Sequence, residues 1–414
     1  MRSNVQRRVV ITGMGAISPL GHDWPTVLAN LRAGRNCVRH YDEWSIYKGL
    51  NTRLGVPAAP FELPEHYNRK STRSMGRVAL MATRASELAL IDAGLLGDPL
   101  LKSGRVGISY GSSAGTPASM SDFGRMVLEK NTQTINATTY IKMMAHTAPV
   151  NIGVFFGITG RVITTSSACT SGSQGIGYAY EAIKAGHQTV MLAGGAEELD
   201  VTDAAVFDTL FATSTRNAEP ELTPRPFDAK RDGLVVGEGA GTLILEDYDH
   251  AVARGARILA EIVGFGTNSD GQHVTQPNAA TMAIAMRLAL QDADLPPEAI
   301  AYVNAHGTAT DHGDIAETTA TNAVFGERMP ISSLKSYTGH TLGACGALEA
   351  WISYEMMREG WFAPTVNLDE VDPRCGALDY IMGEGRRIEG EYVMSNNFAF
   401  GGINTSLILR RWRD

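Results

Sequence analysis

The sequence has few of the features that cross-link a protein or anchor it in a membrane. Its 414 residues include only 4 cysteines, and none of them forms a Cys-x-x-Cys pair. A disulfide framework or a zinc site is therefore not expected. No run of about 18 apolar residues occurs, so we expect no membrane span. The default location is the cytoplasm, where thiols stay reduced. The cysteines are Cys37, Cys169, Cys345 and Cys375.

An excess of positive charge is also missing. Lys and Arg number 36 against 44 Asp and Glu, which gives a net charge of −8. That balance does not favour a nucleic-acid partner. Charged residues make up 19% and hydrophobic residues 44%, so disorder is excluded as the main state. Glycine, by contrast, is abundant at 44 residues without a collagen-like period, which predicts tight turns and close backbone contacts.

Short β-rich runs alternate with amphipathic stretches, the pattern of an α/β protein. The runs are continuously apolar, as in sheets that are buried on both faces. Helices are predicted at Val78–Ala93 and Glu181–Gly186. The first apolar run is short and broken by glycine, so it predicts a strand and not a signal peptide. Strands are predicted at Val9–Thr12, Val106–Ser109, Val162–Thr165, Val190–Ala193 and Gly241–Glu246.

Three segments of the first part of the chain are echoed, in the same order, in the second part. RVVITGMGAIS at 8–18 resembles AEIVGFGTNSD at 260–270, and RVGISYGSSAG at 105–115 resembles AYVNAHGTATD at 301–311. ITTSSACTSGSQGIG likewise resembles ISSLKSYTGHTLGACG further on. We predict a duplicated α/β unit with halves 1–254 and 255–414 and a seam near Arg254–Gly255. No long linker separates the halves, so they should pack as one body.

Cys169 lies in TSSACTSGSQGIGYAYEAIKAG, where a β-branched run leads into a helix rich in small residues. The pattern places the cysteine at a strand-to-helix turn, close to the helix N-terminus. The helix dipole and free N–H groups there favour a thiolate and could hold an oxyanion. An inert buried cysteine is the alternative, since that is common for free cysteines.

Two histidines occupy glycine-rich turns of the second half. His306 follows a strand in VNAHGTATDHGDIAE, and His340 follows Lys335 by five residues in SSLKSYTGHTLGACG. Ligands gather at the carboxyl ends of strands in α/β sheets, so these groups are expected near Cys169. The pair could act as a base for the cysteine or as donors to an oxyanion. A zinc site is disfavoured because no His or Cys lies at short ligand spacing.

Two glycine-rich segments are ambiguous on their own. In SNNFAFGGINTSLIL, Gly401 and Gly402 follow Phe398 and Phe400 and could form a plain hairpin turn or a mobile aromatic gate. TGMGAIS after the first strand suggests a dinucleotide site, but Ser18 stands at the third glycine position. No acidic residue stands out about 20 positions on, so that site is disfavoured.

Taken together, the motifs resemble those of the β-ketoacyl-[acyl carrier protein] synthases of the elongating type II group. The match runs from RVVITGMGAISPLG at 8–21 to NNFAFGGINTSLIL at 396–409. Its most specific parts include ACTSG at 168–172, GGAEE at 194–198, STRN at 214–217 and RPFDAKRDGLVVGEGAG at 225–241. VNAHGTAT followed by GD, K-xxx-TGH-xLGA at 335–344 and NNFAFGG at 396–402 complete the set.

The resemblance implies a thiolase fold, with two similar halves in a five-layered α-β-α-β-α arrangement, and a homodimer whose sheets continue across the subunits. It also implies a reaction. Cys169 takes an acyl chain from acyl carrier protein, malonyl-carrier loses carbon dioxide, and the carbanion attacks the thioester. The product is a β-ketoacyl chain two carbons longer. No cofactor is required by this chemistry.

The resemblance further implies roles for individual residues. His306 and His340 stabilise the enolate, Lys335 supports the site's charge, and Glu317, Phe398 and Gly401 are supporting residues. The N–H groups of Cys169 and Phe400 form the oxyanion hole, and Phe400 is also the gate. Thr308 and Thr310 hold the phosphopantetheine arm. The acyl pocket is matched by Ala205, Val206 and Phe207, and the residues matched to carrier docking are Arg69, Lys70, Arg73, Arg77 and Arg216. In some relatives a structural monovalent cation lies near positions that match Asn304, Glu349, Ser395 and Asn396.

The sequence also departs from the family pattern. Asp311-His312 replace a proline-containing pair, Met75-Gly76 stands where Met-Asp is frequent, and Ala205-Val206 stand where glycines are common. The added methyl groups predict a narrowed acyl tunnel and a preference for short or medium chains. A polyketide-type ketosynthase and a non-catalytic partner subunit remain alternatives. A thiolase is disfavoured, because NNFAFGG lacks the second catalytic cysteine.

Overall fold

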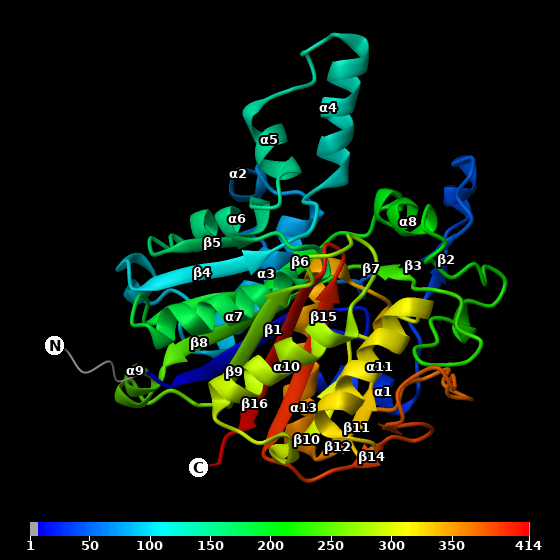
Figure 1. Ribbon diagram of the computed structural model, residues 1–414. Coiled ribbons are helices and arrows are strands. Elements are labelled where there is room, and N and C mark those ends of the chain that lie inside the picture. Colours follow the sequence, from blue (N-terminus) through cyan, green and yellow to red (C-terminus); the bar gives the residue numbers. More distant parts are fainter. Residues whose placement is uncertain (1–6, 414) are drawn as a thin grey trace.

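One continuous sheet of eleven strands runs through the computed structural model, which describes residues 7–413 (Figure 1). In spatial order the strands are β13-β11-β10-β15-β16-β9-β1-β8-β6-β4-β5. In this range no helix is long and apolar enough to span a bilayer. The bounds are β1 Val9–Ile17, β4 Val106–Gly111, β5 Val162–Thr165, β6 Val190–Glu197, β8 Gly239–Asp247, β9 Ala260–Ser269, β10 Ile300–Asn304, β11 Pro330–Ser332, β13 Asp379–Tyr380, β15 Tyr392–Ala399 and β16 Ile403–Arg411.

The sheet consists of two halves with the same topology. The first is ordered β5-β4-β6-β8-β1 and the second β11-β10-β15-β16-β9, so corresponding strands take corresponding places. In each half, two parallel pairings are followed by two antiparallel ones. The halves join where β1 pairs antiparallel with β9. This repeated topology confirms the duplicated architecture predicted from the three sequence echoes.

The helices form three layers around the two half-sheets. Helices α3 (Arg77–Asp92) and α6 (Thr147–Phe156) cover the outer face of the first half. Helices α7 (Ser171–Lys184) and α13 (Cys345–Glu359) lie between the halves and contact strands of both. Helix α10 (Ala279–Ala293) covers the outer face of the second half and packs beside α11 (Asp311–Phe325). The predicted five-layered α-β-α-β-α order is therefore present.

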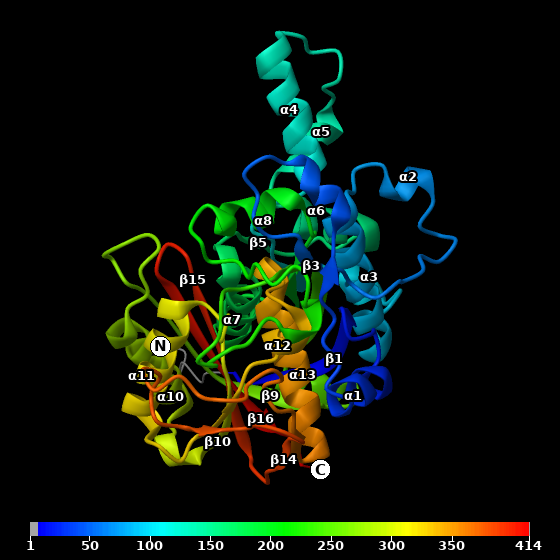
Figure 2. The ribbon, with the colours of Figure 1, turned by 90° about the vertical axis from the view of Figure 1, so that its right-hand side faces the viewer.

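The remaining elements lie outside these layers. Figures 1 and 2 show α4 (Pro117–Glu129) and α5 (Ala137–Met143) as an arm that projects away from the body. The other helices are α1 Trp24–Arg32, α2 Arg69–Thr72, α8 Val201–Asp208, α9 Tyr248–Ala253 and α12 Lys335–Thr338. Short 3₁₀ helices lie at Asp42–Ile46, Pro99–Lys102, Ala168–Thr170, Pro220–Leu222, Pro297–Ala299 and Leu342–Ala344. The short strands are β2 Arg39–His40, β3 Leu54–Val56, β7 Val236–Gly237, β12 Trp361–Phe362 and β14 Arg386–Arg387.

Glycines let the outer helices approach the sheet in both halves. A Cβ on Gly15 of β1 would lie 2.3 Å from the carbonyl oxygen of Ala85 in α3. A Cβ on Gly266 of β9 would lie 2.1 Å from the carbonyl oxygen of Ala285 in α10. Real Cβ atoms cannot come so close to a backbone oxygen. The glycines of the first echo are thus explained by helix packing, which also accounts for the dinucleotide-like spacing near the N-terminus.

The five predicted strands are all present, and most extend further than expected. The prediction of full burial holds for β1, β4, β6 and β8 but fails for β5, where Val162 is 48% exposed. The reason is position, because β5 is the free edge of the first half-sheet. The predicted seam at Arg254–Gly255 falls in the loop between α9 and β9. Of the predicted halves, residues 1–6 and 414 lie outside the described range.

Candidate active site

Cys169 occupies the turn that joins the edge strand β5 to the central helix α7. A single 3₁₀ turn, Ala168–Thr170, precedes the helix, and Ala168 has a left-handed φ of +50°. The helix that follows approaches the sheet closely, since a Cβ on Gly175 would lie 2.4 Å from the Gly194 carbonyl oxygen. The turn is thereby fixed, and the Cys169 side chain is only 4% exposed.

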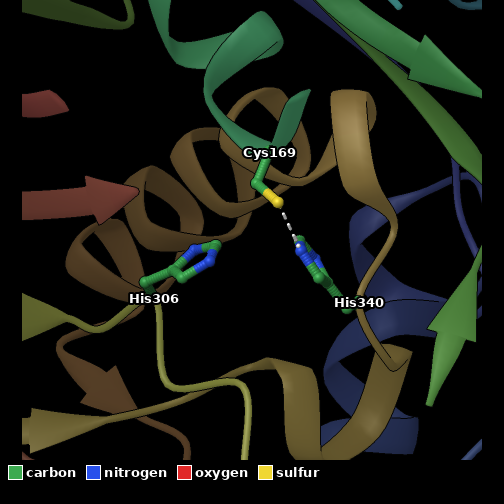
Figure 3. A group of neighbouring side chains, drawn as sticks. All are labelled: Cys169, His306 and His340. Atoms are coloured by element: carbon green, nitrogen blue, oxygen red, sulfur yellow. Dashed lines mark hydrogen bonds between the residues drawn. The ribbon is translucent and has the colours of Figure 1, made fainter. Parts of the chain in front are cut away.

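Both predicted histidines face this sulfur (Figure 3). His340 follows α12, and its Nε2 lies 2.9 Å from the Cys169 Sγ. His306 follows β10, and its ring centroid lies 5.1 Å from that of His340 with the planes nearly perpendicular. One ligand atom from each of the three residues lies within 4.8 Å of the others. Three turns far apart in the sequence thus bring one thiol and two imidazoles together.

Burial dominates the electrostatics of these three groups. It raises the pKa of Cys169 to about 12, although the positive charge of Lys335 and the backbone N–H groups of Phe400 and Cys169 oppose the rise. Burial, reinforced by Lys335, holds the pKa of both His306 and His340 well below the ordinary value. The expected resting thiolate is therefore corrected: the closed site favours a thiol beside two neutral imidazoles, because desolvation outweighs the local dipoles.

Lys335 is almost fully buried, at 1% exposure, behind the catalytic groups and forms an ion pair with Glu349. Burial lowers and Glu349 raises the pKa of Lys335, with a net rise that keeps it charged. Glu349 also accepts a hydrogen bond from Asn397 Nδ2 at 2.7 Å, and the same nitrogen lies 3.5 Å from His306 Nδ1. The sequence did not reveal Asn397 as a link, although it adjoins Phe398 in NNFAFGG.

Glu317 holds the turn that carries His306. Its carboxylate accepts hydrogen bonds from the backbone N–H groups of His306 and Gly307, both at 2.7 Å. Burial raises the pKa of Glu317 to about 8, and the two N–H donors act against that rise. Glu317 does not contact the sulfur through any hydrogen bond found in residues 7–413, so its place is that of a positioning residue.

The β15–β16 hairpin brings Phe400 to the cavity. The backbone N–H groups of Phe400 and Cys169 both act to lower the pKa of the Cys169 thiol, so both lie near its sulfur. Their role as an oxyanion hole stays a prediction. The Phe400 ring lies 5.2 Å from that of Phe207, and Phe398 lies 6.2 Å from His306. Gly401 has a φ of +89° at the hairpin tip, where a side chain would be strained.

Cys169, His306 and His340 line a cavity of about 560 Å³. Thr308 and Thr310 also line it, with their hydroxyl oxygens 2.9 Å apart, and so does Phe207 from the predicted acyl pocket. Neither Ala205 nor Val206 is among the lining residues; Ala205 is half-buried and Val206 is 56% exposed. Of the three residues predicted for the acyl pocket, only Phe207 lines the cavity that the described residues form.

The residues predicted for carrier docking differ in exposure and in ion pairing. Arg69 and Lys70 lie on α2 and Arg73 directly follows it; all three are exposed and make no ion pair within residues 7–413. Arg77, by contrast, is paired with Glu238 through its Nε at 2.8 Å. Arg216 lies 3.6 Å from Asp232 and 3.8 Å from Glu219.

Two groups of residues in the site have atoms that could bind a metal ion. Cys169, His306 and His340 are close enough to share an ion, so the spacing argument against zinc does not hold, but the nearby charge of Lys335 disfavours a dication. The candidate monovalent site lies around Glu349. Asn304 Nδ2 donates to Ser395 Oγ at 3.2 Å, while the side-chain oxygens of Asn304 and Asn396 are buried without a partner in the described residues. Such orphaned oxygens would suit a monovalent cation.

A duplicated five-layered fold with a thiol, two imidazoles and paired backbone N–H groups at one cavity is the arrangement of the thiolase-fold condensing enzymes. Residues 6–251 match the family described as "Beta-ketoacyl synthase, N-terminal domain", and residues 259–369 match "Beta-ketoacyl synthase, C-terminal domain". The chain belongs to the β-ketoacyl synthase family.

Individual relatives match over nearly the whole chain. A 3-oxoacyl-[acyl-carrier-protein] synthase 2 of Vibrio cholerae is 37% identical over 98% of this chain and 99% of its own. A crystal structure of a β-ketoacyl synthase from Burkholderia phymatum is 63% identical, covering 98% of this chain and 100% of that one, with a TM-score of 0.97. A type II PKS acyl-carrier protein in complex with its ketosynthase contains a chain that is 30% identical, covers 99% and 100%, and has a TM-score of 0.87.

Proposed function

We propose that the protein is a β-ketoacyl-[acyl carrier protein] synthase that extends fatty acyl chains by two carbons. It condenses malonyl-carrier with an acyl group held on Cys169 and releases carbon dioxide. The observation that carries the proposal is the 2.9 Å contact between Cys169 Sγ and His340 Nε2, with His306 on the same cavity wall. One nucleophile and two neutral donors are the groups that this two-step reaction needs.

In the first step the thiol of Cys169 attacks the acyl thioester of the carrier. His340 Nε2 is within reach of the thiol proton, so it accepts that proton as the new C–S bond forms. The old C–S bond breaks, and His340 passes the proton to the departing sulfur, so the carrier leaves as a free thiol and His340 is neutral again. The N–H groups of Cys169 and Phe400 hold the oxygen that gains charge in between.

In the second step malonyl-carrier loses carbon dioxide, and its thioester oxygen gains the charge of an enolate. Neutral imidazoles can donate a hydrogen bond to that oxygen, and the low pKa of His306 and His340 keeps both rings neutral at pH 7. The enolate carbon then attacks the acyl carbon on Cys169, the C–S bond breaks, and the released Cys169 thiolate takes up a proton from solvent. The β-ketoacyl product leaves on the carrier.

The partner is an acyl carrier protein with a phosphopantetheine arm. Thr308 and Thr310 line the cavity and would hydrogen-bond this arm, and the exposed cations of α2 would meet the acidic carrier.

No cofactor takes part in the chemistry proposed above. If a monovalent cation is bound by Asn304, Glu349, Ser395 and Asn396, it would stabilise the carboxylate that pairs with Lys335. We place the reaction in the cytoplasm, where the four free thiols stay reduced.

The working form is proposed to be a homodimer. Within residues 7–413 the strand β5 is a sheet edge without a neighbouring strand on its outer side, and Val162 is exposed there, which favours pairing with a second copy. The projecting arm supports the same proposal, because Val127, Leu128 and Tyr140 are 56%, 83% and 50% exposed. Light scattering should give twice the chain mass, and Val162→Asp should shift the protein toward the monomer. A monomeric parent would contradict the proposal.

Chain length is proposed to be set by α8 and the Phe207 ring that lines the cavity. Ala205 and Val206 do not line the cavity of the single chain, so their methyl groups would narrow the tunnel only through the packing of α8 around Phe207; on that basis we propose a preference for short or medium acyl chains. The test is kcat/KM for a length series of acyl-carriers in the parent and in the Ala205→Gly/Val206→Gly variant. A parent that already prefers long saturated chains, or a variant without any gain for them, would contradict this.

The reaction itself is tested with purified protein, malonyl-carrier and acyl-carrier. Mass spectrometry should show a β-ketoacyl-carrier two carbons longer and an acyl adduct on Cys169. An adduct on Cys37, Cys345 or Cys375 with Cys169 free would overturn the assignment. A product extended several times without reduction would favour a polyketide-type ketosynthase instead.

A further inference from the structure

Cys345 is a buried thiol that takes no part in the reaction proposed above. It is the first residue of α13, it is 2% exposed, and it does not line the catalytic cavity. Its Sγ nevertheless lies 3.2 Å from the carbonyl oxygen of Cys169 and donates a hydrogen bond to it. No other side chain within residues 7–413 donates to this carbonyl. The backbone of the proposed nucleophile, in the first half, is thus bound by a side chain of the second half.

The equivalent residue of the first half makes a different contact. Ser171 follows the 3₁₀ turn that begins at Ala168, as Cys345 follows the turn that begins at Leu342. The Ser171 Oγ donates to the carbonyl of Ala168 at 2.7 Å, so this side chain closes its own turn. The Cys345 side chain makes no hydrogen bond to its own turn in the described residues and binds the turn of Cys169 instead. The turn that carries Cys169 is therefore held by one side chain from each half.

Close packing of the two helix starts fixes where the Cys345 thiol lies. A Cβ on Gly172 would lie 2.8 Å from the carbonyl oxygen of Gly343. A Cβ on Gly346 would lie 2.5 Å from the backbone nitrogen of Ser173. Since packed interiors leave no room for such approaches, the starts of α7 and α13 are in direct backbone contact. This contact keeps the thiol against the opposite turn.

A second contact connects Cys345 to the charged groups behind the site. Asn397 Nδ2 donates to the Cys345 Sγ at 3.6 Å and to Glu349 at 2.7 Å. Glu349 in turn forms the ion pair with Lys335. Burial raises the pKa of Cys345 well above its ordinary value, although the charge of Lys335 opposes the rise. The thiol therefore keeps its proton at neutral pH and remains a hydrogen-bond donor.

We propose that Cys345 is a positioning residue for the turn that carries Cys169. The inference rests on the proposed function, in which the N–H of Cys169 helps to hold the oxygen of the acyl thioester. A donor to the Cys169 carbonyl fixes the turn, and a fixed turn needs no reorganisation when charge develops on that oxygen. The enolate oxygen is held by His306 and His340, which lie on other turns. Cys345 should therefore serve acyl transfer more than decarboxylation.

The experiment separates the hydrogen-bond donor from the volume of the side chain. Cys345→Ala removes the S–H group, whereas Cys345→Ser keeps a donor at the same position. Cys375→Ala is the matched control, since Cys375 is a buried thiol at 9% exposure that does not line the cavity. Acylation of Cys169 by octanoyl-pantetheine, carbon dioxide release from malonyl-carrier, amide hydrogen exchange of residues 168–172 and thermal melting are measured for the parent and all three variants.

Cys345→Ala should slow acylation of Cys169 roughly threefold to tenfold, because the carbonyl loses a buried hydrogen bond. The KM for octanoyl-pantetheine and the release of carbon dioxide should stay near those of the parent. Amide exchange of residues 168–172 should become faster, because the turn opens locally more often. Cys345→Ser should restore both acylation and exchange to within about twofold of the parent. Cys375→Ala should behave as the parent does.

Equal losses in Cys345→Ala and Cys345→Ser would assign the effect to packing and overturn the proposal. Equal slowing of acylation and decarboxylation would assign the effect to the fold as a whole and would also overturn it, as would unchanged acylation and exchange in Cys345→Ala. A parent that makes no β-ketoacyl product would instead refute the proposed function. The exchange comparison needs no substrate, so it would still decide whether Cys345 holds the turn.

Discussion

Each half of the molecule contains an equivalent 3₁₀ turn, and the two turns have different roles. In the first half, Ala168 and Cys169 form a 3₁₀ turn before α7; in the second, Leu342 and Gly343 form one before α13. Ala168 and Leu342 have nearly equal φ values of +50° and +48°. The same strained geometry thus presents a thiol in one half and no side chain in the other.

The reason for this difference lies in the surroundings of the two turns. The N–H of Gly343 donates to Glu197 at 2.9 Å, and a Cβ at this position would lie 2.8 Å from that carboxylate. Glu197 also accepts the N–H of Ser113 at 2.8 Å, so it ties the second turn to the first half. The duplicated fold therefore contains two equivalent turns: one carries the proposed nucleophile, and the other connects the two halves. The second half contributes His306, His340 and Lys335 in its place.

Exchanging the residues of the two turns tests this difference most severely. Cys169→Ala should lower condensation roughly 10³-fold or more, because no other thiol lines the cavity formed by the described residues. Adding Gly343→Cys to this variant should not restore activity, since the new side chain would collide with Glu197. The measurement is β-ketoacyl product by mass spectrometry, with Cys37→Ala as the control. Recovery in the double variant would mean that the two turns are interchangeable.

Alanine substitution of either histidine should slow decarboxylation, but only one of the two substitutions should also affect the Cys169 thiol. His306→Ala and His340→Ala should each slow carbon dioxide release from malonyl-carrier by roughly 10²–10³-fold, because each removes one donor to the enolate. Of the two histidines, only His340 forms a hydrogen bond with Cys169 in the described residues, at 2.9 Å, so only its loss should also slow iodoacetamide labelling of the thiol. Some acylation of Cys169 should persist in both variants. Full decarboxylation by both would contradict the assignment.

The sequence predicted most of the site because its chemistry is carried by short motifs. Cys169 precedes α7, His306 follows β10, and His340 lies in the turn after α12; such turns of an α/β sheet converge on one edge. The duplication could be predicted for a similar reason, since the three echoes show which segments of the two halves correspond. The side-chain contacts between distant parts of the chain could not be predicted, because nothing in the linear order links Lys335 to Glu349 or Glu197 to Gly343.

The protonation state of Cys169 and the exposure of individual side chains could not be predicted from the sequence either. A helix start predicts a lowered cysteine pKa, yet complete burial raises that of Cys169 to about 12. The residues around Phe211 predict only a helix and a loop, although its φ is +53°, because a left-handed φ has a clear signal when the residue is glycine and none when it is phenylalanine. The edge position of β5 depends on the whole sheet order, so the exposure of Val162 could not be predicted locally.

The charge of Lys335 is predicted to tune all three catalytic groups at once. Lys335→Met combined with Glu349→Gln removes the buried ion pair without leaving a lone charge. Without the lysine, the pKa of Cys169 rises further, so iodoacetamide labelling at pH 8 should slow by roughly threefold to tenfold. The pKa values of both histidines rise as well, so the acid limb of the decarboxylation profile should move to higher pH. An unchanged profile would contradict this; Lys184→Met, in a partly exposed pair with Asp292, is the control.

The smallest effect concerns packing, where the two halves should respond alike. Gly15→Ala would place a Cβ 2.3 Å from a carbonyl oxygen of α3, and Gly266→Ala would place one 2.1 Å from a carbonyl oxygen of α10. Each substitution should therefore destabilise the fold by roughly 1–3 kcal/mol. Gly124 in α4 has open space around it, and Gly124→Ala should instead stabilise by about 0.5–1 kcal/mol. Urea unfolding measures all three, and kcat should stay near that of the parent because none of these glycines lines the cavity. A large loss in one half with none in the other would show that the repeated glycines no longer serve the same contact.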